Sequence, residues 1–333
     1  MIVVTGGAGF IGSNLVAGLE AQGYRDIVVC DVLGADDKWK NIAKRELRDV
    51  VSPDSLMSFL EWYADEIDAI FHLGAISATT EKDADLIIEN NFNLSCALWE
   101  WCAENDVRFI YASSAATYGD GDAGFHDDAS VEHLAKLRPL NPYGWSKHLF
   151  DRRVARLLAD QKEGRAVKVP PQWAGLKFFN VYGPHEYHKG DMMSVACKLF
   201  PQIMAGKTAR LFKSAHPDYQ DGGQMRDFVY VDDCVDIMLW LYQNKGVNGL
   251  FNVGSGVARS FKDLAEACYS ALGQAPKIEY IDMPDHLKTK YQYFTQASMD
   301  KLRAAGYSKP ITTLEDGVRA YMQDYMVKAD QYK

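Results

Sequence analysis

The sequence predicts an α/β protein built on a doubly wound parallel sheet with helices on both faces. Three observations indicate this fold class. Short apolar segments of strand length alternate with segments of helical periodicity, the first apolar segment runs directly into a glycine-rich turn, and the second ends at an acidic residue. The chain has 333 residues, enough for a large core and for either one large domain or two moderate ones.

The composition is ordinary for a globular protein, with 47% hydrophobic and 24% charged residues. The formal net charge is −9, and cations are scattered among acids, so we expect no nucleic-acid partner. No run approaches the roughly 18 apolar residues of a membrane span, and we expect no secretory signal. The six cysteines form no C-x-x-C pair and no metal-ligand spacing, which favours reduced thiols in a cytoplasmic protein and no bound metal.

The first element in chain order is a strand–turn–helix unit. The pattern predicts a short buried strand over Ile2–Thr5, a glycine-rich turn over Gly6–Gly12 and a helix that carries Leu15 and Leu19. A dinucleotide fingerprint requires this context, because glycines let the backbone approach a pyrophosphate and the helix N-terminus supplies positive partial charge. We therefore predict a Rossmann-type cofactor site here rather than a plain tight turn.

The second strand, Ile27–Cys30, ends at Asp31, about twenty residues beyond the glycines. An acid at this position binds the ribose 2′-OH of the adenosine and so favours NAD. The segment that follows is cationic, and its side chains could hold a 2′-phosphate instead: Lys38, Lys40, Lys44 and Arg45. A solvated loop face explains these cations nearly as well, so the residues leave NAD and NADP open.

The alternation then continues. We expect a helix from Leu56 to Ala64, a strand over residues 68–75 that ends in a glycine turn, a long helix from about Ala84 to Ala103 and a strand over residues 108–112. The carboxyl ends of such strands lie beside the glycine loop, where ligands bind. His72 falls inside the first of these strands and is interpreted as structural. Ser114 leaves the second and could bind a reacting hydroxyl or carbonyl.

The second half is predicted to carry a smaller domain. Strands are expected over residues 175–179, 207–212, 228–231, 251–254 and 278–281, with helices over 193–204, from 232 and from 314. We assign residues 1–180 to the Rossmann domain, to which residues about 226–258 return, and residues 181–333 to an α/β substrate-binding domain. The loop 183–190 holds two histidines and an acid, but no helix aligns them for a metal.

Proton-transfer chemistry is expected at the segment Asn141–Lys147. Pro142 suits the first helical position and Asn141 the N-cap. Tyr143 and Lys147 are four residues apart and therefore share one helix face. A phenol has an unperturbed pKa of about 10, and a nearby ammonium lowers that pKa. The pair could exchange a proton with a substrate hydroxyl, although an isolated Tyr-x-x-x-Lys also occurs by chance.

Together these residues resemble an extended short-chain dehydrogenase/reductase: the glycine loop, Asp31, the turn after His72, Ser114 and the Tyr143/Lys147 pair. The resemblance covers essentially the whole chain. It implies a Rossmann sheet with a smaller C-terminal substrate domain, and a nucleotide-activated sugar as substrate. It also implies that Ser114 and Tyr143 are the catalytic hydroxyls, and that Lys147 holds the nicotinamide ribose and lowers the pKa of Tyr143.

A narrower resemblance is to the ADP-glyceromanno-heptose 6-epimerase family, whose members invert C6 of the heptose precursor of lipopolysaccharide core. The segments 77–81, 111–119, 179–184, 188–190, 226–231, 291–296 and 302–307 carry it. It implies that Lys189 is a second acid/base, that the cofactor is NADP, with NAD as the alternative, and that the enzyme is a cytoplasmic homo-oligomer. The chain departs from the family at Leu73, often acidic there, at Asp191 and Lys198, and in a long insert over 215–224.

The motifs and the resemblance define the candidate site residues. The catalytic candidates are Ser114, Tyr143, Lys147 and Lys189. Arg226 could clamp a diphosphate in bidentate fashion, although an ion pair with Asp227 or Asp232 would also explain it. The candidate cofactor contacts are Gly6, Gly9, Phe10, Ile11, Gly12, Asp31, Val32, Lys38, Leu73, Gly74, Ala75, Asn90, Lys147 and Val181. The candidate substrate contacts are Ser77, Asn180, Asp191, Lys198, Phe212, Arg226 and Tyr291.

Three other functions stay open at this point. One is another nucleotide-sugar epimerase, such as a 4-epimerase, on the same scaffold. The second is a nucleotide-sugar dehydratase, which needs an acid and a base directly after the serine, where this chain has Ala115 and Ala116. The third is a non-catalytic NAD(P)-binding protein, which has no use for the proton-transfer groups Ser114, Tyr143 and Lys147. Exchange of substrate stereochemistry without added cofactor would separate an enzyme from such a protein.

Overall fold

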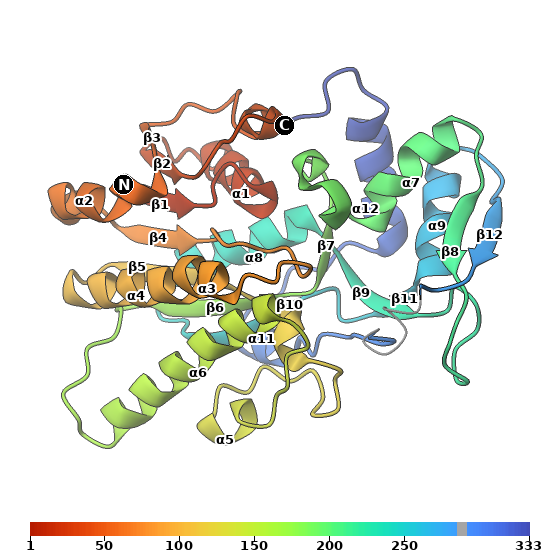
Figure 1. The fold of residues 1–333 in the computed structure, drawn as a ribbon. Helices are drawn as coiled ribbons and strands as arrows, with labels where there is room; N and C mark the ends of the chain where they lie inside the picture. The colour runs from red at the N-terminus through yellow and green to blue at the C-terminus, as the bar shows by residue number, and fades with distance from the viewer. Residues whose placement is uncertain (285–291) are drawn as a thin grey trace.

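The computed structural model describes residues 1–284 and 292–333. A seven-stranded parallel sheet forms the larger part of the molecule, and two small sheets lie beyond its carboxyl edge (Figure 1). The strand order is β10-β6-β5-β4-β1-β2-β3. All strands run parallel, but the chain adds β2 and β3 on one side of β1 and then continues with β4 on its other side. The bounds are β1 (Ile2–Thr5), β2 (Ile27–Cys30), β3 (Asp49–Val51), β4 (Ala69–His72), β5 (Arg108–Ser114), β6 (Trp173–Phe178) and β10 (Gly249–Val253).

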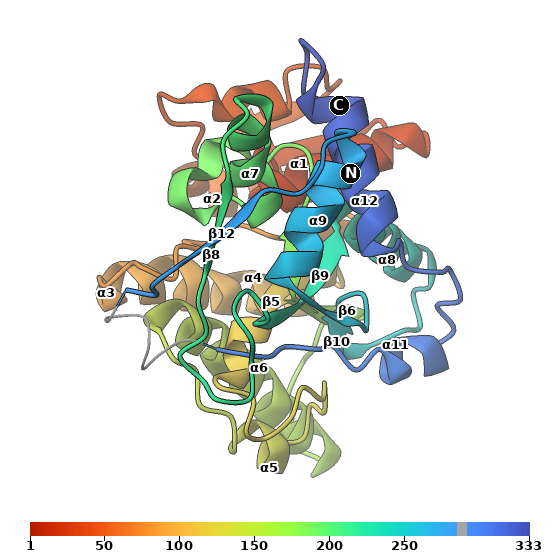
Figure 2. The same ribbon diagram turned by 90° about the vertical axis from the view of Figure 1, so that its right-hand side faces the viewer.

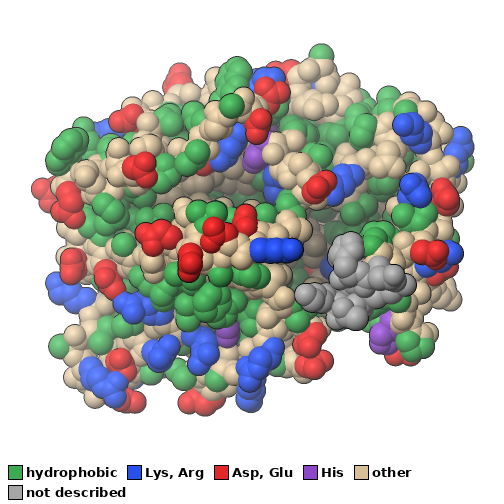
Figure 3. Space-filling view, in the orientation of Figure 1, with side chains coloured by type: hydrophobic (Ala, Val, Ile, Leu, Met, Phe, Trp, Pro, Cys, Tyr) green, Lys and Arg blue, Asp and Glu red, His purple; other side chains and the backbone are tan. Residues whose placement is uncertain are grey.

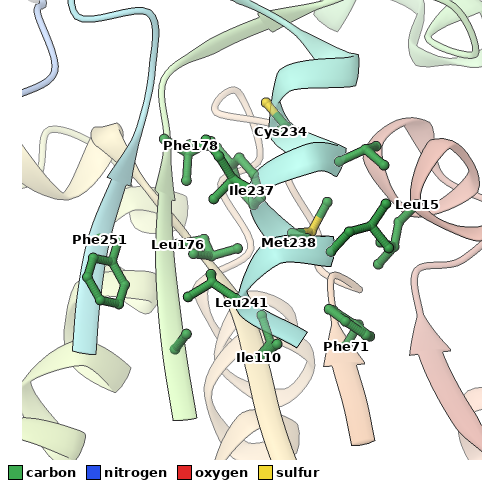
Figure 4. Close-up of a cluster of buried hydrophobic side chains, with 14 of the residues drawn as sticks. Leu15, Phe71, Ile110, Leu176, Phe178, Cys234, Ile237, Met238, Leu241 and Phe251 are labelled. Carbon is green, nitrogen blue, oxygen red and sulfur yellow. The ribbon is translucent and has the colours of Figure 1, made fainter. Parts of the chain in front are cut away.

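The central strands are buried on both faces, so their side chains alternate between two cores. Val4 and Ile110 point into a core covered by α1 (Phe10–Ala21) and α8 (Val231–Gln243), and Figure 4 shows the apolar side chains of α8 lying over the strands. Val3 and Phe109 point into the other core, covered by α2 (Leu56–Trp62), α4 (Leu94–Glu104) and α6 (Pro142–Lys162). Burial on both faces explains why these strands are almost continuously apolar in sequence.

Two small sheets form the second part of the structure (Figure 2). β9 (Met225–Tyr230) pairs in parallel with β7 (Asn180–Tyr182) and antiparallel with β11 (Ala258–Ser260). β8 (Ala209–Phe212) pairs in parallel with β12 (Ile278–Ile281). A separate apolar core joins these strands to α7 (Val195–Met204), α9 (Phe261–Ala271) and α12 (Leu314–Ala320). Shorter helices complete the described chain: α3 (Ala84–Ile87), α5 (Val131–Leu134) and α11 (Asp300–Ala304).

Most predicted elements are confirmed, with three differences. Residues 226–258 divide between the two parts: α8 and β10 return to the large sheet, whereas β9 and β11 belong to the three-stranded sheet. β3, β7 and β11 lie outside the predicted set, because three residues are too few to establish a periodicity. The long helix expected over 84–103 exists, but a π-helical turn, Ile88–Asn93, separates α3 from α4.

On the face in Figure 3, acidic and basic side chains are interspersed over both parts of the molecule. Within residues 1–284 and 292–333, no helix is long and apolar enough to cross a bilayer.

The turn after β1 packs against the turn after β4, and Gly6 makes this contact possible. Its φ of +66° lies in the left-handed region, which favours glycine. A Cβ atom at Gly6 would lie 2.6 Å from the backbone nitrogen of Gly74. The two turns therefore form one compact unit at the carboxyl edge of the sheet.

We predict that Gly6→Ala lowers the free energy of unfolding by roughly 2 kcal/mol or more, through left-handed strain and overpacking. Gly246→Ala is the matched control, because a Cβ there meets nothing within 4 Å, and should change it by less than about 0.5 kcal/mol. Urea unfolding of the two variants makes the comparison. Equal stability of both would show that the two turns can separate without cost.

Candidate active site

The glycine turn has the features that a dinucleotide needs. Gly9 is the N-cap of α1, no side chain caps this helix, and its first turn holds no acidic residue. Its N-terminal backbone N–H groups and positive partial charge are therefore suited to a pyrophosphate. Phe10 is buried at the start of the helix, and Ile11 is partly buried against both neighbouring cores. The residues at this turn fit the predicted cofactor.

Asp31 lies at the end of β2, as predicted. Its carboxylate accepts hydrogen bonds from the backbone nitrogens of Ala8 (2.9 Å) and Val32 (2.8 Å). Lys38 forms an ion pair with the same carboxylate at 2.6 Å and donates to the carbonyl oxygen of Val32 at 2.9 Å. The acid and the cation expected to distinguish NAD from NADP are therefore direct neighbours.

The catalytic candidates Ser114 and Tyr143 are brought together by β5 and α6. Asn141 caps α6 by accepting from the backbone nitrogen of Gly144 at 2.8 Å, and Pro142 occupies the first turn, as predicted. A Cβ at Gly144 would lie 2.7 Å from the carbonyl oxygen of Ala116. Glycine at this position therefore lets α6 approach the chain after β5, and the hydroxyl of Ser114 hydrogen-bonds to the phenol of Tyr143.

The electrostatics of the pair differ from the sequence prediction. We expected Lys147 to lower the pKa of Tyr143. In the structure burial is the larger effect and raises the pKa of Tyr143, while the hydrogen bond with Ser114 lowers it. Burial also lowers the pKa of Lys147 to about 8, against the opposing charge of Asp151. Sequence spacing indicates neighbours on a helix but not their desolvation, which explains the difference.

His72 is structural, as the sequence indicated. Its Nε2 lies 3.0 Å from the hydroxyl of Ser95, and its Nδ1 lies 2.7 Å from the hydroxyl of Thr5. Ser95 donates to the carbonyl oxygen of Asn91 (2.6 Å), so it accepts from Nε2, and Nδ1 accepts from Thr5. Thr5 in turn accepts from the backbone nitrogen of Gly74 at 3.1 Å.

Asn91 is a site residue that the sequence analysis missed. Its side chain accepts from the backbone nitrogen of Ile76 (2.8 Å) and donates to the carbonyl oxygen of Ile76 (3.0 Å) and the hydroxyl of Ser146 (3.1 Å). It therefore ties the loop after β4 to the catalytic helix. The candidate Asn90 is exposed, and its side chain donates to the carbonyl oxygen of Leu86. Asn91 differs from Asn90 only in being buried. Two adjacent asparagines give no sequence signal for which of them is buried.

Lys189 lies in the 3-10 segment Tyr187–Met192, against the start of α1. Its ammonium is 5.2 Å from the centre of the Phe10 ring. Burial lowers the pKa of Lys189, and the nearby carboxylate of Glu186 opposes this. Glu186 is fully buried and accepts from the hydroxyl of Ser194 at 2.7 Å. Lys189 is thus a partly buried cation next to the glycine turn.

The C-terminal residues hold this loop in place. His185 is buried in the left-handed region at φ +76°, and its Nε2 accepts from the backbone nitrogen of Lys333 at 2.9 Å. Its Nδ1 must therefore carry the proton and donate to the hydroxyl of Ser13 at 2.9 Å. Lys44 donates to the carbonyl oxygen of Tyr332 at 2.7 Å. Figure 1 shows the C-terminus beside the N-terminal part of the chain.

The substrate candidates surround the carboxyl edge of the large sheet. Ser77 is exposed in the loop after β4, Asn180 is exposed at the start of β7, and Lys198 on α7 donates to the carbonyl oxygen of Asp191 at 2.6 Å. Tyr291 lies outside the described residues. The other candidates occupy loops or strand ends: Leu73 and Ala75 after β4, Val181 on β7, and Phe212 at the end of β8.

Arg226 is a buried residue of β9. Its guanidinium donates to the carbonyl oxygen of Met225 at 2.8 Å and lies over the ring of Phe261. The carboxylate of Asp227 accepts from backbone nitrogens, among them that of Ser255 at 2.6 Å. Asp232 pairs with Lys333. The two acids considered as alternatives for Arg226 therefore have these other partners.

The predicted insert forms a folded loop between β8 and β9. The backbone nitrogen of Ser214 donates to the carboxylate of Asp221 at 2.8 Å. The rings of His216, Tyr219 and Tyr293 lie with their centres 5.1–5.5 Å apart.

In residues 1–284 and 292–333, no group of three or more His, Cys, Asp or Glu side chains could hold a metal ion.

Comparison with known proteins gives consistent results. The model of the NAD dependent epimerase/dehydratase family matches residues 2–254. A relative named ADP-L-glycero-D-manno-heptose-6-epimerase, from Nitratidesulfovibrio vulgaris strain DP4, is 53% identical over 337 residues, covering 100% of both chains.

Solved structures of two epimerases are also similar. The ADP-L-glycero-D-manno-heptose-6-epimerase of Helicobacter pylori has a TM-score of 0.77 at 28% identity, covering 97% of this chain and 95% of that chain. The UDP-glucose 4-epimerase of Thermus thermophilus, in complex with NAD, has a TM-score of 0.74 at 25% identity, covering 96% of this chain and 97% of that chain.

We predict that His72 makes the fold less stable in acid. Burial and the charge of Lys147 lower its pKa from 6.5 to about 3, so the unfolded chain binds a proton that the folded chain excludes. Stability should fall between pH 6.5 and 3 by up to about 1.4 kcal/mol per pH unit from this group. As the pH falls, the unfolding free energy of His72→Gln should decline less steeply than that of the wild type. The unfolding free energy of His126→Gln, at an exposed histidine, should decline as steeply as that of the wild type. Parallel declines in all three proteins would contradict the assignment.

Proposed function

The chain belongs to the NAD dependent epimerase/dehydratase family, and we propose that it inverts C6 of ADP-glycero-manno-heptose by transient oxidation and re-reduction. The observation that carries this is the end-to-end match at 53% identity to an ADP-L-glycero-D-manno-heptose-6-epimerase. The enzyme is an isomerase that uses a nicotinamide cofactor. We propose a cytoplasmic homo-oligomer that acts in the synthesis of the lipopolysaccharide core precursor. Its Rossmann domain comprises residues 1–180 with α8 and β10, and its substrate domain comprises the rest of residues 181–333.

The proposed mechanism assigns separate tasks to the residues at the end of β5 and on α6. A nicotinamide held at the glycine turn would supply the hydride chemistry that oxidises and re-reduces C6. Tyr143 takes the proton of the C6 hydroxyl in its phenolate form, which must form against the burial that raises its pKa, and the Ser114 hydroxyl donates a hydrogen bond to the same oxygen. Lys147, at the buried side of the helix, orients the ribose of the cofactor. Rotation about C5–C6 would then present the other face of the keto sugar to the same groups.

Lys189 is proposed as the second proton-transfer group. The carbonyl oxygen occupies different positions before and after rotation, so one fixed phenol serves one of them best. Lys189 lies beside the glycine turn on the loop 183–190, whereas Tyr143 lies on a different element, the helix α6. Its burial favours the neutral amine and so makes it a usable base.

A dehydratase is less consistent with the site. The two residues after Ser114 are Ala115 and Ala116, which begin a 3-10 helix and offer neither an acid nor a base. A dehydratase would also have to remove a carbon-bound proton and expel hydroxide. Reversible hydride transfer at one carbon needs only the groups already described.

We propose NADP as the preferred cofactor, with NAD as the alternative. The ammonium of Lys38 lies beside Asp31, where the adenosine ribose would bind, and it could pair with a 2′-phosphate. Asp31, by contrast, suits a free 2′-OH. The preference between NADP and NAD depends on whether Lys38 or Asp31 contacts the ribose.

The function is tested by incubating the purified protein with the ADP-heptose and following the configuration at C6 by NMR, without added cofactor. We expect epimerisation by the wild-type protein. Tyr143→Phe keeps the ring but removes the ionisable oxygen, so turnover should fall by roughly 10²-fold or more with cofactor binding retained. Absence of C6 exchange in the wild type would reject the proposed substrate, and near-normal turnover of the variant would reject Tyr143 as the base.

Lys38→Ala should weaken NADP more than NAD, because only NADP offers a 2′-phosphate to the ammonium. Calorimetric titration of the cofactor-depleted protein with both dinucleotides measures the difference. Lys40→Ala is a suitable control, since this neighbouring lysine pairs with the exposed carboxylate of Asp37. Equal losses for NAD and NADP in Lys38→Ala would mean that Lys38 does not contact the phosphate.

Lys189→Met removes the ammonium but keeps most of the stem. If Lys189 transfers a proton, kcat should fall by roughly 10²-fold while KM stays nearly constant; if it only binds the substrate, the loss should appear mainly in KM. Lys207→Met, at an exposed turn, should change neither. Lys189→Met and Tyr143→Phe should also be tested with a substrate analogue already oxidised to the aldehyde, because oxidation and reduction then take place on separate molecules. An unchanged kcat for Lys189→Met would disprove the two-base mechanism.

A further inference from the structure

A completely buried ion pair lies beneath the catalytic candidates. The ammonium of Lys177 on β6 is 2.8 Å from the carboxylate of Asp151 on α6, and both side chains are 0% exposed. Neither residue is among the groups assigned to the reaction. Full burial of two charges is unfavourable unless each has further partners, so the contacts of the pair indicate what it does.

The pair joins the elements that hold Ser114. The Asp151 carboxylate accepts from the hydroxyls of Ser113 (2.7 Å) and Tyr111 (3.1 Å), which both lie on β5. Lys177 donates to the hydroxyl of Thr117 at 2.6 Å. Thr117 donates to the carbonyl oxygen of Ser114 at 2.7 Å. The Asp151 carboxylate on α6 therefore joins three elements: the end of β5, the 3-10 helix Ala115–Tyr118 and the neighbouring strand β6.

The same carboxylate lies one helical turn beyond Lys147. Tyr143, Lys147 and Asp151 follow at intervals of four on α6, so a single helix carries the phenol, the ammonium and the buried anion. The negative charge of Asp151 raises the pKa of Lys147, while burial lowers it to about 8. The anion therefore acts on the charge of Lys147 as well as on the position of Ser114.

We propose that Asp151 and Lys177 are positioning residues, which fix Ser114 relative to Tyr143 and keep Lys147 in its charged form. This rests on the roles proposed above for Ser114, Tyr143 and Lys147. A stabilising role alone does not require ions, because a buried ion pair can often be replaced by apolar residues of similar volume without loss of stability. The charge near Lys147 is the feature that such a replacement would remove.

Other titratable groups around the pair contribute to the same local field. His72 on β4 faces Lys147, and burial with that charge lowers its pKa to about 3. His148 on α6 is close to both members, and its pKa is lowered to about 4, chiefly by burial. The remaining groups are Tyr111 on β5, Tyr118 in the 3-10 helix, Arg138 before α6, Arg152 on α6, and Asp127 and Lys301 beyond Tyr118.

The test compares the charge state of Lys147 in three variants. In protein labelled with ¹³Cε-lysine, the Lys147 signal is assigned with Lys147→Met and titrated by NMR. Asp151→Asn removes the nearby anion, so the midpoint should fall by about one pH unit from its wild-type value. Lys177→Met keeps the anion and should not lower the midpoint. Asp233→Asn, a buried acid that binds Thr312 from α8, is the control and should leave it unchanged.

Epimerase assays over pH complete the design. In Asp151→Asn the pH dependence of kcat should move to lower pH with the Lys147 midpoint, and kcat should fall by about 10-fold or more in both pair variants. An unmoved midpoint in Asp151→Asn would overturn the proposal, as would losses of kcat that merely follow the melting temperature. If Asp151→Asn does not fold, Ser113→Ala and Lys177→Met test the positioning role through kcat. Because the titration needs no substrate, it remains decisive even if the proposed epimerase activity is absent.

Discussion

The active site depends on one continuous chain of hydrogen bonds that links the glycine turn to the catalytic helix. It begins where Thr5 accepts from Gly74, between the turns after β1 and β4, and passes through His72 and Ser95 to Asn91. From Asn91 it continues to Ser146, which donates to the carbonyl oxygen of Tyr143 at 2.8 Å. Its side chains are largely buried, so an unmade bond would leave a polar group without water. The turns after β1 and β4 and the proposed base Tyr143 are therefore positioned by the same set of contacts.

The sequence predicted the parts of this arrangement that follow local rules. The strands β1, β2 and β4 are short apolar runs because both of their faces are buried, and Asn141 with Pro142 has the chemistry of a helix start. The parts that it missed depend on tertiary burial. Nothing in the local pattern separates the buried Asn91 from the exposed Asn90. The raised pKa of Tyr143 likewise follows from desolvation, which residue spacing does not describe.

The loop with Lys189 is held by different means from the end of β5 with Ser114. Ser114 is fixed from below by a buried ion pair, whereas the 183–190 loop is fixed from outside by the C-terminal residues through His185. Asn41 adds a further connection, because its side chain donates to the carbonyl oxygens of both Ala8 and His185. Ser114 and Lys189 therefore belong to regions with separate supports.

The folded loop between β8 and β9 has a consequence for how this enzyme could be redesigned. The loop is closed by its own contact between Ser214 and Asp221, and its rings pack on Tyr293 rather than on the large sheet. None of the hydrogen bonds described above for Ser114 and Tyr143 passes through it. Substitutions confined to residues 214–221 should therefore leave the arrangement of Ser114 and Tyr143 unchanged.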